Sequence, residues 1–354
     1  MKLHLRKTHI VSILILILLA VFTIIFIHKF TNNSSEQEII TEIRQPDKLL
    51  LGFSQIGSES AWRTRNTQSI MEAAEENDIQ IIFDDAQQKQ ENQLKAIRSF
   101  IVYQVDVIAF VPIVEDGWDN VLTEAQEAGI PVIVVDRQIN ADTSLYAGFL
   151  GENGLEEGRR AARFLINKCR DVHDTINILE MSGTENSSVV RERAKGFREI
   201  IGTDPKFQII HSEDGDFLRS RGKEIVENLI ENSRPQSGNG KYKTDGLYYK
   251  DQKIHAVYSH NDSMTLGLLD SIEKYGVNTR NTIIISVDAE QKSIDALIAG
   301  KLNCVVECNP NLGPMLMQLV KQIANGEQIP RVTYNTETVF SEDDDFSLYE
   351  PRGY

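Results

Sequence analysis

Short apolar segments alternate with longer segments of helical periodicity along the chain after residue 48. The apolar segments have the length of strands and are rich in Val, Ile and Phe, which favours β-structure. They fall into two successive sets. The first set is Leu49–Ser54, Gln80–Asp84, Val107–Val111, Val132–Asp136 and Leu145–Gly148. The second set is Ile176–Met181, Phe207–Ser212, Ala256–Ser259, Ile283–Asp288 and Cys304–Glu307.

Helical segments separate these strands. One of them is Gln88–Gln104, in which Leu94, Ile97 and Ile101 fall on one helical face. The same spacing recurs near the end of the chain, in Leu316, Leu319, Val320 and Ile323. Continuous apolar strands joined by helices are typical of parallel sheets covered on both faces. The pattern therefore predicts an α/β protein with two such units, one for each set of strands.

The first thirty residues form a segment of a different kind. Lys2, Arg6 and Lys7 precede an apolar run over 10–27, which as a helix would be about 27 Å long, close to the thickness of a bilayer core. The run ends in bulky residues without a small-residue cleavage site, so we expect a retained transmembrane anchor over residues 1–30 rather than a cleaved signal peptide. The basic flank then lies in the cytoplasm, residues 31–47 are a linker, and the remainder is extracellular or periplasmic.

Charge and cysteine content exclude several classes of protein. The 354-residue chain carries a net charge of −15, whereas nucleic-acid-binding surfaces need clustered Lys and Arg. It has three cysteines and no metal-ligand spacing, so neither a metal nor a cofactor is predicted. Cys304 and Cys308 would lie about 13 Å apart along a regular strand, too far for a disulfide. We therefore expect buried or free thiols.

Polar side chains follow several predicted strands, at the ends where open α/β sheets bind ligands. Helix N-capping accounts for Ser, Asp and Asn at such junctions, but not for Arg137 beside Asp136. Trp62 and Phe217 lie in loops that follow strands. Carboxylates, amides and guanidinium groups bind adjacent hydroxyls, and an aromatic ring covers the apolar face of a sugar, so these residues predict a sugar site. The strand-end groups are Ser54-Gln55, Asp84-Asp85, Asp136-Arg137, Ser259–Asp262 and Asp288.

A set of short segments forms a recognisable pattern: Gly52–Arg63, Gln87–Gln93, Asp136-Arg137, Arg191–Phe197, Gly215–Phe217, Ser259–Asp262 and Asn309–Asn311. Together they resemble the ribose-binding-like, type I class of bacterial sugar-binding proteins. Within this class the first two segments look closest to the galactofuranose-binding proteins of ABC importers, and the others are shared more widely. The resemblance covers the chain from Lys48 onward.

This resemblance implies two Rossmann-like lobes joined by a three-crossing hinge, with a monosaccharide bound in the cleft between them. The first lobe would span 48–151 plus 309–338, and the second 152–308 plus 339–354. Arg191 is preferred to Arg193 because it matches the first Arg of the family's Arg-Glu-Arg segment, and Glu307 and Asn309 are weaker candidates. The implied ligands are Glu59, Trp62, Arg63, Asp136 and Arg137 from the first lobe and Arg191, Phe217, Asn261 and Asp288 from the second.

The implied function is capture of a sugar for the permease of an ABC importer, without catalysis. Galactofuranose is the expected sugar, while arabinose, another pentose or a pyranose stay open. A membrane-anchored sensor that signals to a histidine kinase is the alternative partner arrangement. An enzyme is disfavoured because nucleophile elbows, phosphate-binding glycine loops and two-His-plus-carboxylate spacings are absent from the sequence. A transcription regulator would need a helix-turn-helix before Lys48, where the apolar run stands instead.

One segment departs from the family pattern. Residues Ser233–Lys253 form an extra polar stretch that contains Asp245-Gly246 between strand-favouring residues. Asp-Gly pairs favour tight hairpin turns, so we expect a surface hairpin here. The segment is interpreted either as a tolerated loop insertion or as a docking surface for a partner.

Overall fold

The computed structural model describes residues 48–233 and 242–354. Residues 49–354 form one compact unit. The anchor and linker predicted for residues 1–47 lie outside the described residues and stay a prediction. Among the helices that the structure describes, none has the length and apolarity needed to cross a membrane.

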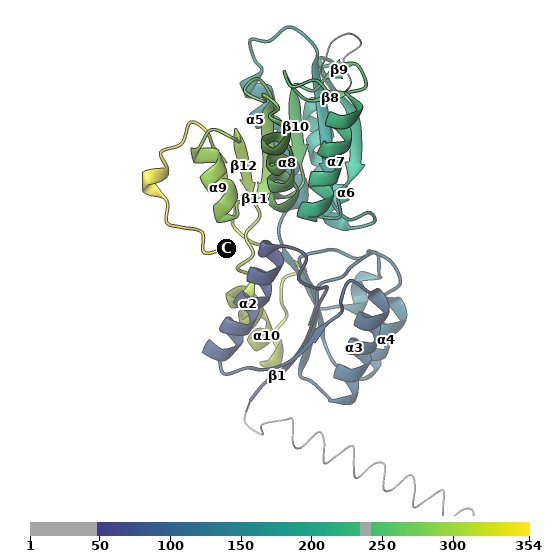
Figure 1. Ribbon diagram of the computed structural model, residues 1–354. Coiled ribbons are helices and arrows are strands. Elements are labelled where there is room, and N and C mark those ends of the chain that lie inside the picture. Colours follow the sequence, from purple (N-terminus) through teal and green to yellow (C-terminus); the bar gives the residue numbers. More distant parts are fainter. Residues whose placement is uncertain (1–47, 234–241) are drawn as a thin grey trace, which may run out of the picture. The chain divides into compact units, whose positions relative to one another are not determined.

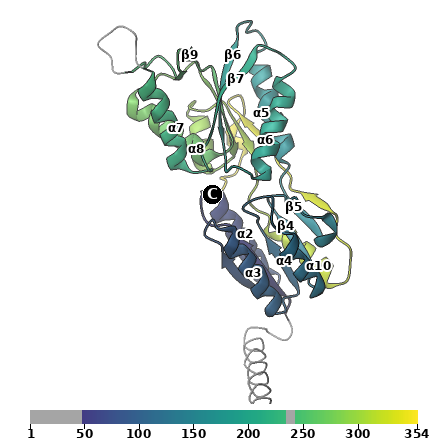
Figure 2. The same cartoon turned by 90° about the vertical axis from the view of Figure 1, so that its right-hand side faces the viewer.

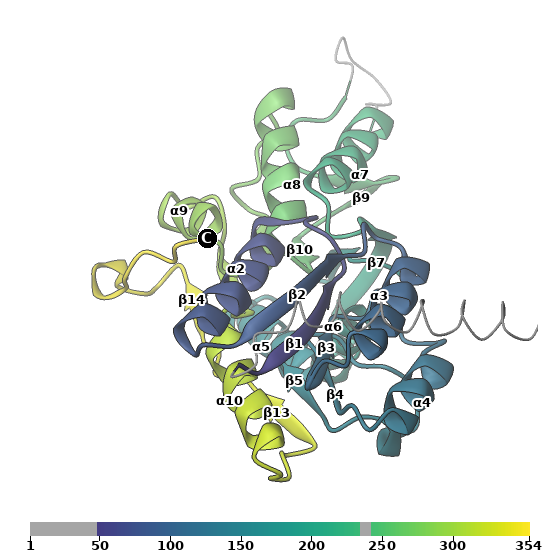
Figure 3. The same ribbon diagram turned by 90° about the horizontal axis from the view of Figure 1, so that it is seen from below.

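The first of two lobes contains a parallel six-stranded sheet (Figure 1). Helices α2 (Ala61–Glu76) and α10 (Gly313–Ala324) pack together on one face, and α3 (Gln90–Val102) and α4 (Asp119–Glu127) cover the other, as Figure 3 shows from below. Each face has its own apolar core, and the strands β1, β3 and β4 are buried along their whole length. In spatial order the strands are β13 (Val332–Tyr334), β5 (Gly148–Gly151), β4 (Val132–Val135), β3 (Val107–Phe110), β1 (Leu50–Gln55) and β2 (Gln80–Asp85).

The second lobe repeats this plan with a six-stranded sheet whose edge strand β14 is antiparallel. Helices α5 (Gly154–Lys168) and α6 (Ser188–Ile201) pack together on one face, and α7 (Arg219–Asn232) and α8 (Asp262–Tyr275) pack together on the other (Figure 2). Helix α9 (Gln291–Ile298) contributes to the same apolar core as α7 and α8. In spatial order the strands are β14 (Val339–Ser341), β12 (Cys304–Glu307), β11 (Ile283–Asp288), β10 (Ala256–Ser259), β6 (Ile176–Ser182) and β7 (Phe207–Asp214).

The chain passes between the two lobes three times. The crossings lie between β5 and α5, between β12 and α10, and between β13 and β14. Neither lobe is therefore a continuous piece of sequence. The α/β class and the two parallel sheets predicted from the sequence are confirmed.

The prediction for the fifth strand is wrong in position. Leu145–Gly148 was expected to be a strand, but Thr143–Leu145 forms a 3-10 turn and β5 begins at Gly148. Asp142 caps this turn by accepting a hydrogen bond from the backbone N–H of Ser144. All four residues of β5 are buried. The strand therefore begins where the chain enters the core.

The extra polar segment forms a hairpin, although its turn lies elsewhere than Asp245-Gly246. Strands β8 (Tyr248–Tyr249) and β9 (Gln252–Lys253) pair around a turn in which Lys250 has a φ of 55°. The Tyr249 ring stacks on His211 of β7, with centroids 4.2 Å apart. This stacking places the hairpin against the second sheet. Residues 234–241 of this segment lie outside the described residues.

The three cysteines are free and buried, as predicted. Cys169 follows helix α5, Cys304 begins β12, and Cys308 follows that strand at the second crossing. Because β12 is regular over Cys304–Glu307, Cys304 and Cys308 cannot approach each other.

Candidate functional site

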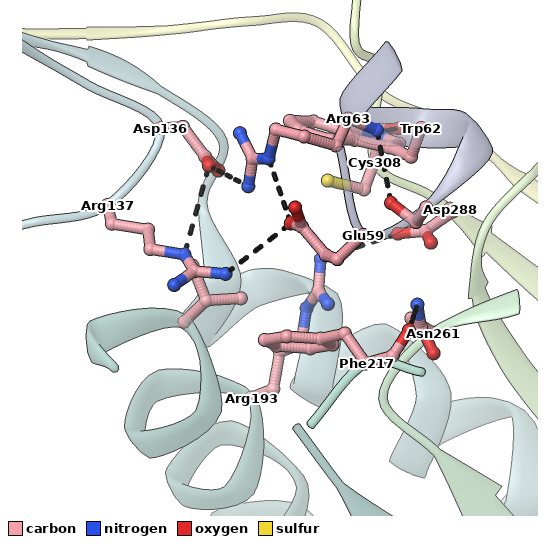
Figure 4. A pocket seen from close by; sticks show the side chains of 12 residues that line it. Glu59, Trp62, Arg63, Asp136, Arg137, Arg193, Phe217, Asn261, Asp288 and Cys308 are labelled. Atoms are coloured by element: carbon pink, nitrogen blue, oxygen red, sulfur yellow. Dashed lines mark hydrogen bonds and ion pairs between the residues drawn. The ribbon is translucent and has the colours of Figure 1, made fainter. Parts of the chain in front are cut away.

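A pocket lies between the lobes, at the carboxyl ends of their strands (Figure 4). Eight of the nine residues predicted as ligands line it, and Arg191 does not. Four further residues were not predicted: Ser60, Val189, Arg193 and Cys308. The eight are Glu59, Trp62, Arg63, Asp136, Arg137, Phe217, Asn261 and Asp288.

A charge cluster forms the first-lobe side. Helix α2 begins after Ser60, whose side chain accepts a hydrogen bond from the Arg63 backbone N–H, so Glu59 and Arg63 meet at the helix start. The Arg63 guanidinium pairs with Glu59 at 3.0 Å and with Asp136 at 2.7 Å. Burial disfavours both charges, but Arg63 and Arg137 outweigh it and keep the pKa of Glu59 below its usual value, while Asp136 and Glu59 raise the pKa of Arg63. Glu59 and Arg63 are therefore ionised and stabilise each other.

Arg137 joins this cluster to the second lobe. Its guanidinium lies 4.0 Å from both Glu59 and Asp136 and 5.4 Å from the centroid of the Phe217 ring. Burial and neighbouring Arg63 lower the pKa of Arg137 to about 10, so it stays charged at neutral pH. Phe217 has a φ of 60°, and its ring lies 2.0 Å from the position that a Cβ atom on Gly183 would occupy. Gly183 thus makes room for the ring.

Trp62 connects the two lobes through its indole. Its Nε1–H donates a hydrogen bond to the backbone carbonyl of Cys308 at 2.6 Å. The ring packs within the apolar core of the second lobe and leaves 5% of its surface exposed. The Arg63 guanidinium lies 4.7 Å from the ring centroid. Trp62 therefore acts as a wall of the pocket and as a contact across the cleft.

The second-lobe arginine that lines the pocket is Arg193, whereas the sequence analysis preferred Arg191. Arg193 is buried, pairs with Glu157 at 2.6 Å, and donates to the His260 carbonyl. Arg191 is two residues away, on another side of α6, where it is half exposed and pairs with Glu115 of the first lobe. Because helical neighbours on one face are three or four residues apart, Arg193 shares the buried face with Phe197, and Arg191 cannot.

Asn261 and Asp288 complete the second-lobe side. The Asn261 side chain caps helix α8 by accepting from the Met264 backbone N–H at 3.0 Å and donates to the Phe217 carbonyl at 3.1 Å. The capping interpretation of this residue therefore holds together with its position in the pocket. Burial and neighbouring Asp262 raise the pKa of Asp288 well above its usual value.

The pocket has the composition of a site for a neutral polyhydroxylated ligand. Three carboxyl and three guanidinium groups line the pocket together with two aromatic rings, so hydrogen-bond donors and acceptors are abundant. The cavity volume of about 30 Å³ suits one or two waters rather than a sugar ring. A sugar ring would fit only if the lobes separated and the ion pairs rearranged around it.

Comparison with known proteins gives this arrangement a family. Residues 51–328 match the family model of the periplasmic binding protein domain. The chain belongs to this family. The resemblance inferred from the sequence is thereby confirmed, and the fold of the periplasmic binding protein accounts for both sheets and all three crossings.

Three relatives of this periplasmic binding protein have stated sugars. The galactofuranose-binding protein YtfQ of Escherichia coli K12 is 37% identical over 298 residues, which cover 83% of this chain and 88% of the relative. A Mycobacterium smegmatis structure in complex with β-D-fucofuranose is 40% identical, with a TM-score of 0.75 and coverage of 83% of this chain and 91% of that one. The arabinose-transporter binding protein of Shewanella sp. ANA-3, bound to arabinofuranose, is 35% identical, with a TM-score of 0.74 and coverage of 83% and 92%.

Glu307 and Asn309, the weaker candidates for sugar ligands in this periplasmic binding protein, do not line the pocket. Glu307 accepts from the Thr338 backbone N–H at 2.9 Å and pairs with Arg352. Asn309 accepts from the backbone N–H of Asn311 at 3.0 Å. Both side chains thus support the crossings instead of facing the pocket.

Residues 352–354 contact the backbone of the turn that carries Asp288. The sequence did not predict this role. The Arg352 Nε–H donates to the carbonyl of Ala289, and the Tyr354 hydroxyl donates to the carbonyl of Asp288 at 3.1 Å. Asp288 and Ala289 have φ values of 124° and 68°, a region that costs energy for residues other than glycine. The segment therefore secures a strained turn that places the Asp288 carboxylate in the pocket. A signal for this contact is lacking in the local sequence, because the partners are distant in the chain.

Replacing Tyr354 with phenylalanine should weaken ligand affinity about two- to tenfold, because the turn loses one hydrogen bond. The ring stays, so the melting temperature should change little. Isothermal titration calorimetry measures the effect, with the sugar that gives the largest shift in a thermal-unfolding panel. Tyr349→Phe, in a residue that is 44% exposed, is the matched control. Equal affinities for the wild type and Tyr354→Phe would refute the supporting role.

The stability of the second lobe should decrease as pH rises from about 4 to 8. Burial, reinforced by Glu290, raises the pKa of Asp262 to about 8, whereas an unfolded Asp titrates near 4. Between these values the folded state holds a proton that the unfolded state has released, so rising pH favours unfolding. Asp262→Asn removes the contribution of this group, while Asp288 keeps its own. Urea denaturation at pH 6 and pH 9 should therefore show the variant gaining stability relative to the wild type as the pH rises.

Asp270→Asn on the same helix is the control. Its hydrogen bond with Arg219 lowers the pKa of Asp270, so its contribution to stability is lost only at acid pH. For each variant, the difference from the wild type in the free energy of unfolding is compared between pH 6 and pH 9. If this difference does not change with pH for Asp262→Asn, just as for Asp270→Asn, the titration assigned to Asp262 is wrong.

Proposed function

We propose that this chain binds a monosaccharide in its furanose form between its two lobes and delivers it to the permease of an ABC importer. The observation that carries the proposal is the pocket itself, which guanidinium and carboxyl groups line together with Trp62 and Phe217. Charged donors and acceptors bind sugar hydroxyls more strongly than neutral ones, and the rings cover apolar carbon atoms. Binding and closure, rather than a chemical reaction, are the output.

The furanose ring is supported by the relatives. The three relatives with the sugars named above are a galactofuranose-binding protein and two proteins bound to fucofuranose or arabinofuranose. All three share at least a third of their residues with this chain over most of its length. We therefore place a five-membered ring with several free hydroxyls in the pocket.

Capture would proceed by hinge closure at the three crossings. An incoming sugar exchanges the ion pairs of Arg63 and Arg137 for hydrogen bonds to its hydroxyls. The sugar also fills the space between the lobes. When the lobes close, the hydrogen bond from Trp62 to the Cys308 carbonyl forms and the sugar is enclosed. A micromolar dissociation constant corresponds to about −8 kcal/mol, which a few charge-assisted hydrogen bonds and two ring contacts can supply.

The proposal includes a location outside the cytoplasm, because an importer receives its sugar there. The sequence predicts that an apolar segment tethers the protein to the membrane. In the source organism, deleting the gene should abolish uptake of the bound sugar. Normal uptake together with loss of a sugar-dependent transcriptional response would favour the histidine-kinase alternative instead.

Thermal unfolding with a panel of sugars tests the binding function. At one hundred times its dissociation constant, a ligand adds about 2.7 kcal/mol of stability, which raises the melting temperature by several degrees. Galactofuranose, arabinose, fucose and ribose are compared with methyl pyranosides, which are locked in the six-membered ring. We expect a shift with at least one free sugar and none with the pyranosides. Equal shifts with pyranosides would overturn the furanose assignment, and a flat panel would overturn sugar binding.

A further inference from the structure

Four acid and thiol side chains meet where the chain crosses between the lobes. Glu152 follows β5 on the first crossing, Glu157 lies in the first turn of α5, Cys308 follows β12 on the second crossing, and Glu337 lies on the third. Ligand atoms of Glu157, Cys308 and Glu337 all lie within 4.8 Å of one another. These residues are distant in sequence, which explains why a metal-binding spacing is absent from the chain.

This hinge cluster, Glu152, Glu157, Cys308 and Glu337, is buried. Glu157 is fully buried, and Glu152 is 6% and Cys308 4% exposed. The side chain of Glu337 is 3% exposed. Three carboxylate oxygens of the cluster accept no hydrogen bond from the described part of the chain. They are both oxygens of Glu152 and the Oε1 atom of Glu157. Buried carboxylates without donors are costly, so the cluster requires a further partner.

The neighbouring arginines do not balance this charge. Arg193 pairs with Glu157 at 2.6 Å and lies 4.0 Å from Asp288. Arg160 is partly exposed and lies 3.7 Å from Glu337. With Arg193 paired to Glu157 and Arg160 near Glu337, the three hinge carboxylates exceed these two cations by one negative charge. Either protons or a divalent cation can supply the missing charge.

We propose that Glu157, Cys308 and Glu337 bind a divalent cation of the zinc type at the hinge, with Glu152 in its immediate surroundings. Thiolate and carboxylate groups are established zinc ligands, and a thiolate disfavours Mg²⁺ and Ca²⁺. Zinc–ligand distances of about 2.0 to 2.3 Å place ligand atoms about 3.5 Å apart, so the widest pair must approach by about 1 Å.

Without a cation the cluster must hold protons. A bound cation would displace these protons. Because its ligands come from the second lobe and from two crossings, it would also restrain the hinge. The site lies at the crossings and adjoins the sugar pocket through Cys308.

Cadmium titration of the tag-free, chelator-treated full chain tests the proposal without any sugar, so the result does not depend on the proposed function. Cadmium replaces zinc and gives an ultraviolet charge-transfer band with thiolate. We expect one cadmium per chain with this band, and zinc should raise the melting temperature. Cys308→Ser should lose the band, and Glu337→Gln should keep it while binding at least about tenfold more weakly.

Cys304→Ser is the matched control, since this equally buried thiol lies four residues away on β12. It should keep both the band and the affinity. Absence of the band in the wild type, its loss in Cys304→Ser, or unchanged affinity in Glu337→Gln would overturn the site. If Cys308→Ser does not fold, the result with Glu337→Gln and the effect of zinc on wild-type melting decide the question. A wild-type protein that melts at the same temperature with and without zinc would hold protons at the hinge instead, which would also overturn the site.

Discussion

Replacing Arg137 with alanine should weaken sugar binding by about 100-fold or more, equivalent to about 2.7 kcal/mol. Arg137 is the guanidinium that lies both near Glu59 and Asp136 and over the Phe217 ring, so its loss removes donors from the centre of the pocket. The fold should survive, because Arg63 remains paired with Glu59 at 3.0 Å and with Asp136 at 2.7 Å. Calorimetric titration measures the affinity, and circular dichroism checks the fold.

Arg98→Ala is the matched control for this experiment. Arg98 belongs to the same lobe and forms a two-pronged pair with Glu124 at 2.7 and 2.8 Å, but the pair is exposed on the surface. Its removal should leave affinity unchanged and alter stability by less than about 1 kcal/mol. If Arg137→Ala binds sugar as tightly as Arg98→Ala does, the pocket is assigned to the wrong residues.

Arg193→Met should destabilise the protein by about 3–5 kcal/mol, because it leaves the fully buried Glu157 without its partner. Sugar affinity should fall as well, since Arg193 lines the pocket. Urea denaturation in the presence of a chelator measures the stability, so that metal at the hinge cannot compensate. Adding Glu157→Gln to this variant should restore part of the loss, because the unpaired charge is then removed.

Arg191→Met is the comparison that separates the two arginines. Arg191 is about half exposed, so its removal should change the free energy of unfolding by about 0.5 kcal/mol or less. Similar losses of stability in Arg191→Met and Arg193→Met would contradict the assignment of Arg193 to the interior.

The fold was predictable where local pattern and burial agree. Strands β3 and β4 are buried throughout and consist of apolar residues alone, and β1 and β12 are buried apolar segments that end in polar residues. Strand β5 contains two apolar residues between glycines, and Leu145 before it supplied a misleading signal. Strands β13 and β14 are three residues long and pair with partners distant in the chain, so their patterns are too short to identify.

Eight of the pocket residues were predicted from motifs, and the absence of Arg191 from the pocket has a geometric cause. A resemblance to an Arg-Glu-Arg segment cannot distinguish two arginines that are two residues apart. The helical spacing of Arg193, Phe197 and Ile201 identifies the buried face of α6 and would have selected Arg193. The support of Asp288 by Tyr354 and the hinge cluster arise from segments far apart in sequence. Only the folded chain brings these groups together.

The threefold passage between lobes also determines the order in which the protein can fold during synthesis. The first lobe receives its edge strand β13 and helix α10 from residues 313–334, and α10 contributes Leu316, Met317 and Val320 to the core on α2. Domains generally fold as units once their residues are available. A ribosome that has released residues 49–151 has therefore released a sheet with an open edge and an incomplete core. The lobe that is made first must wait for nearly the whole chain, and the two lobes should reach their native state almost together.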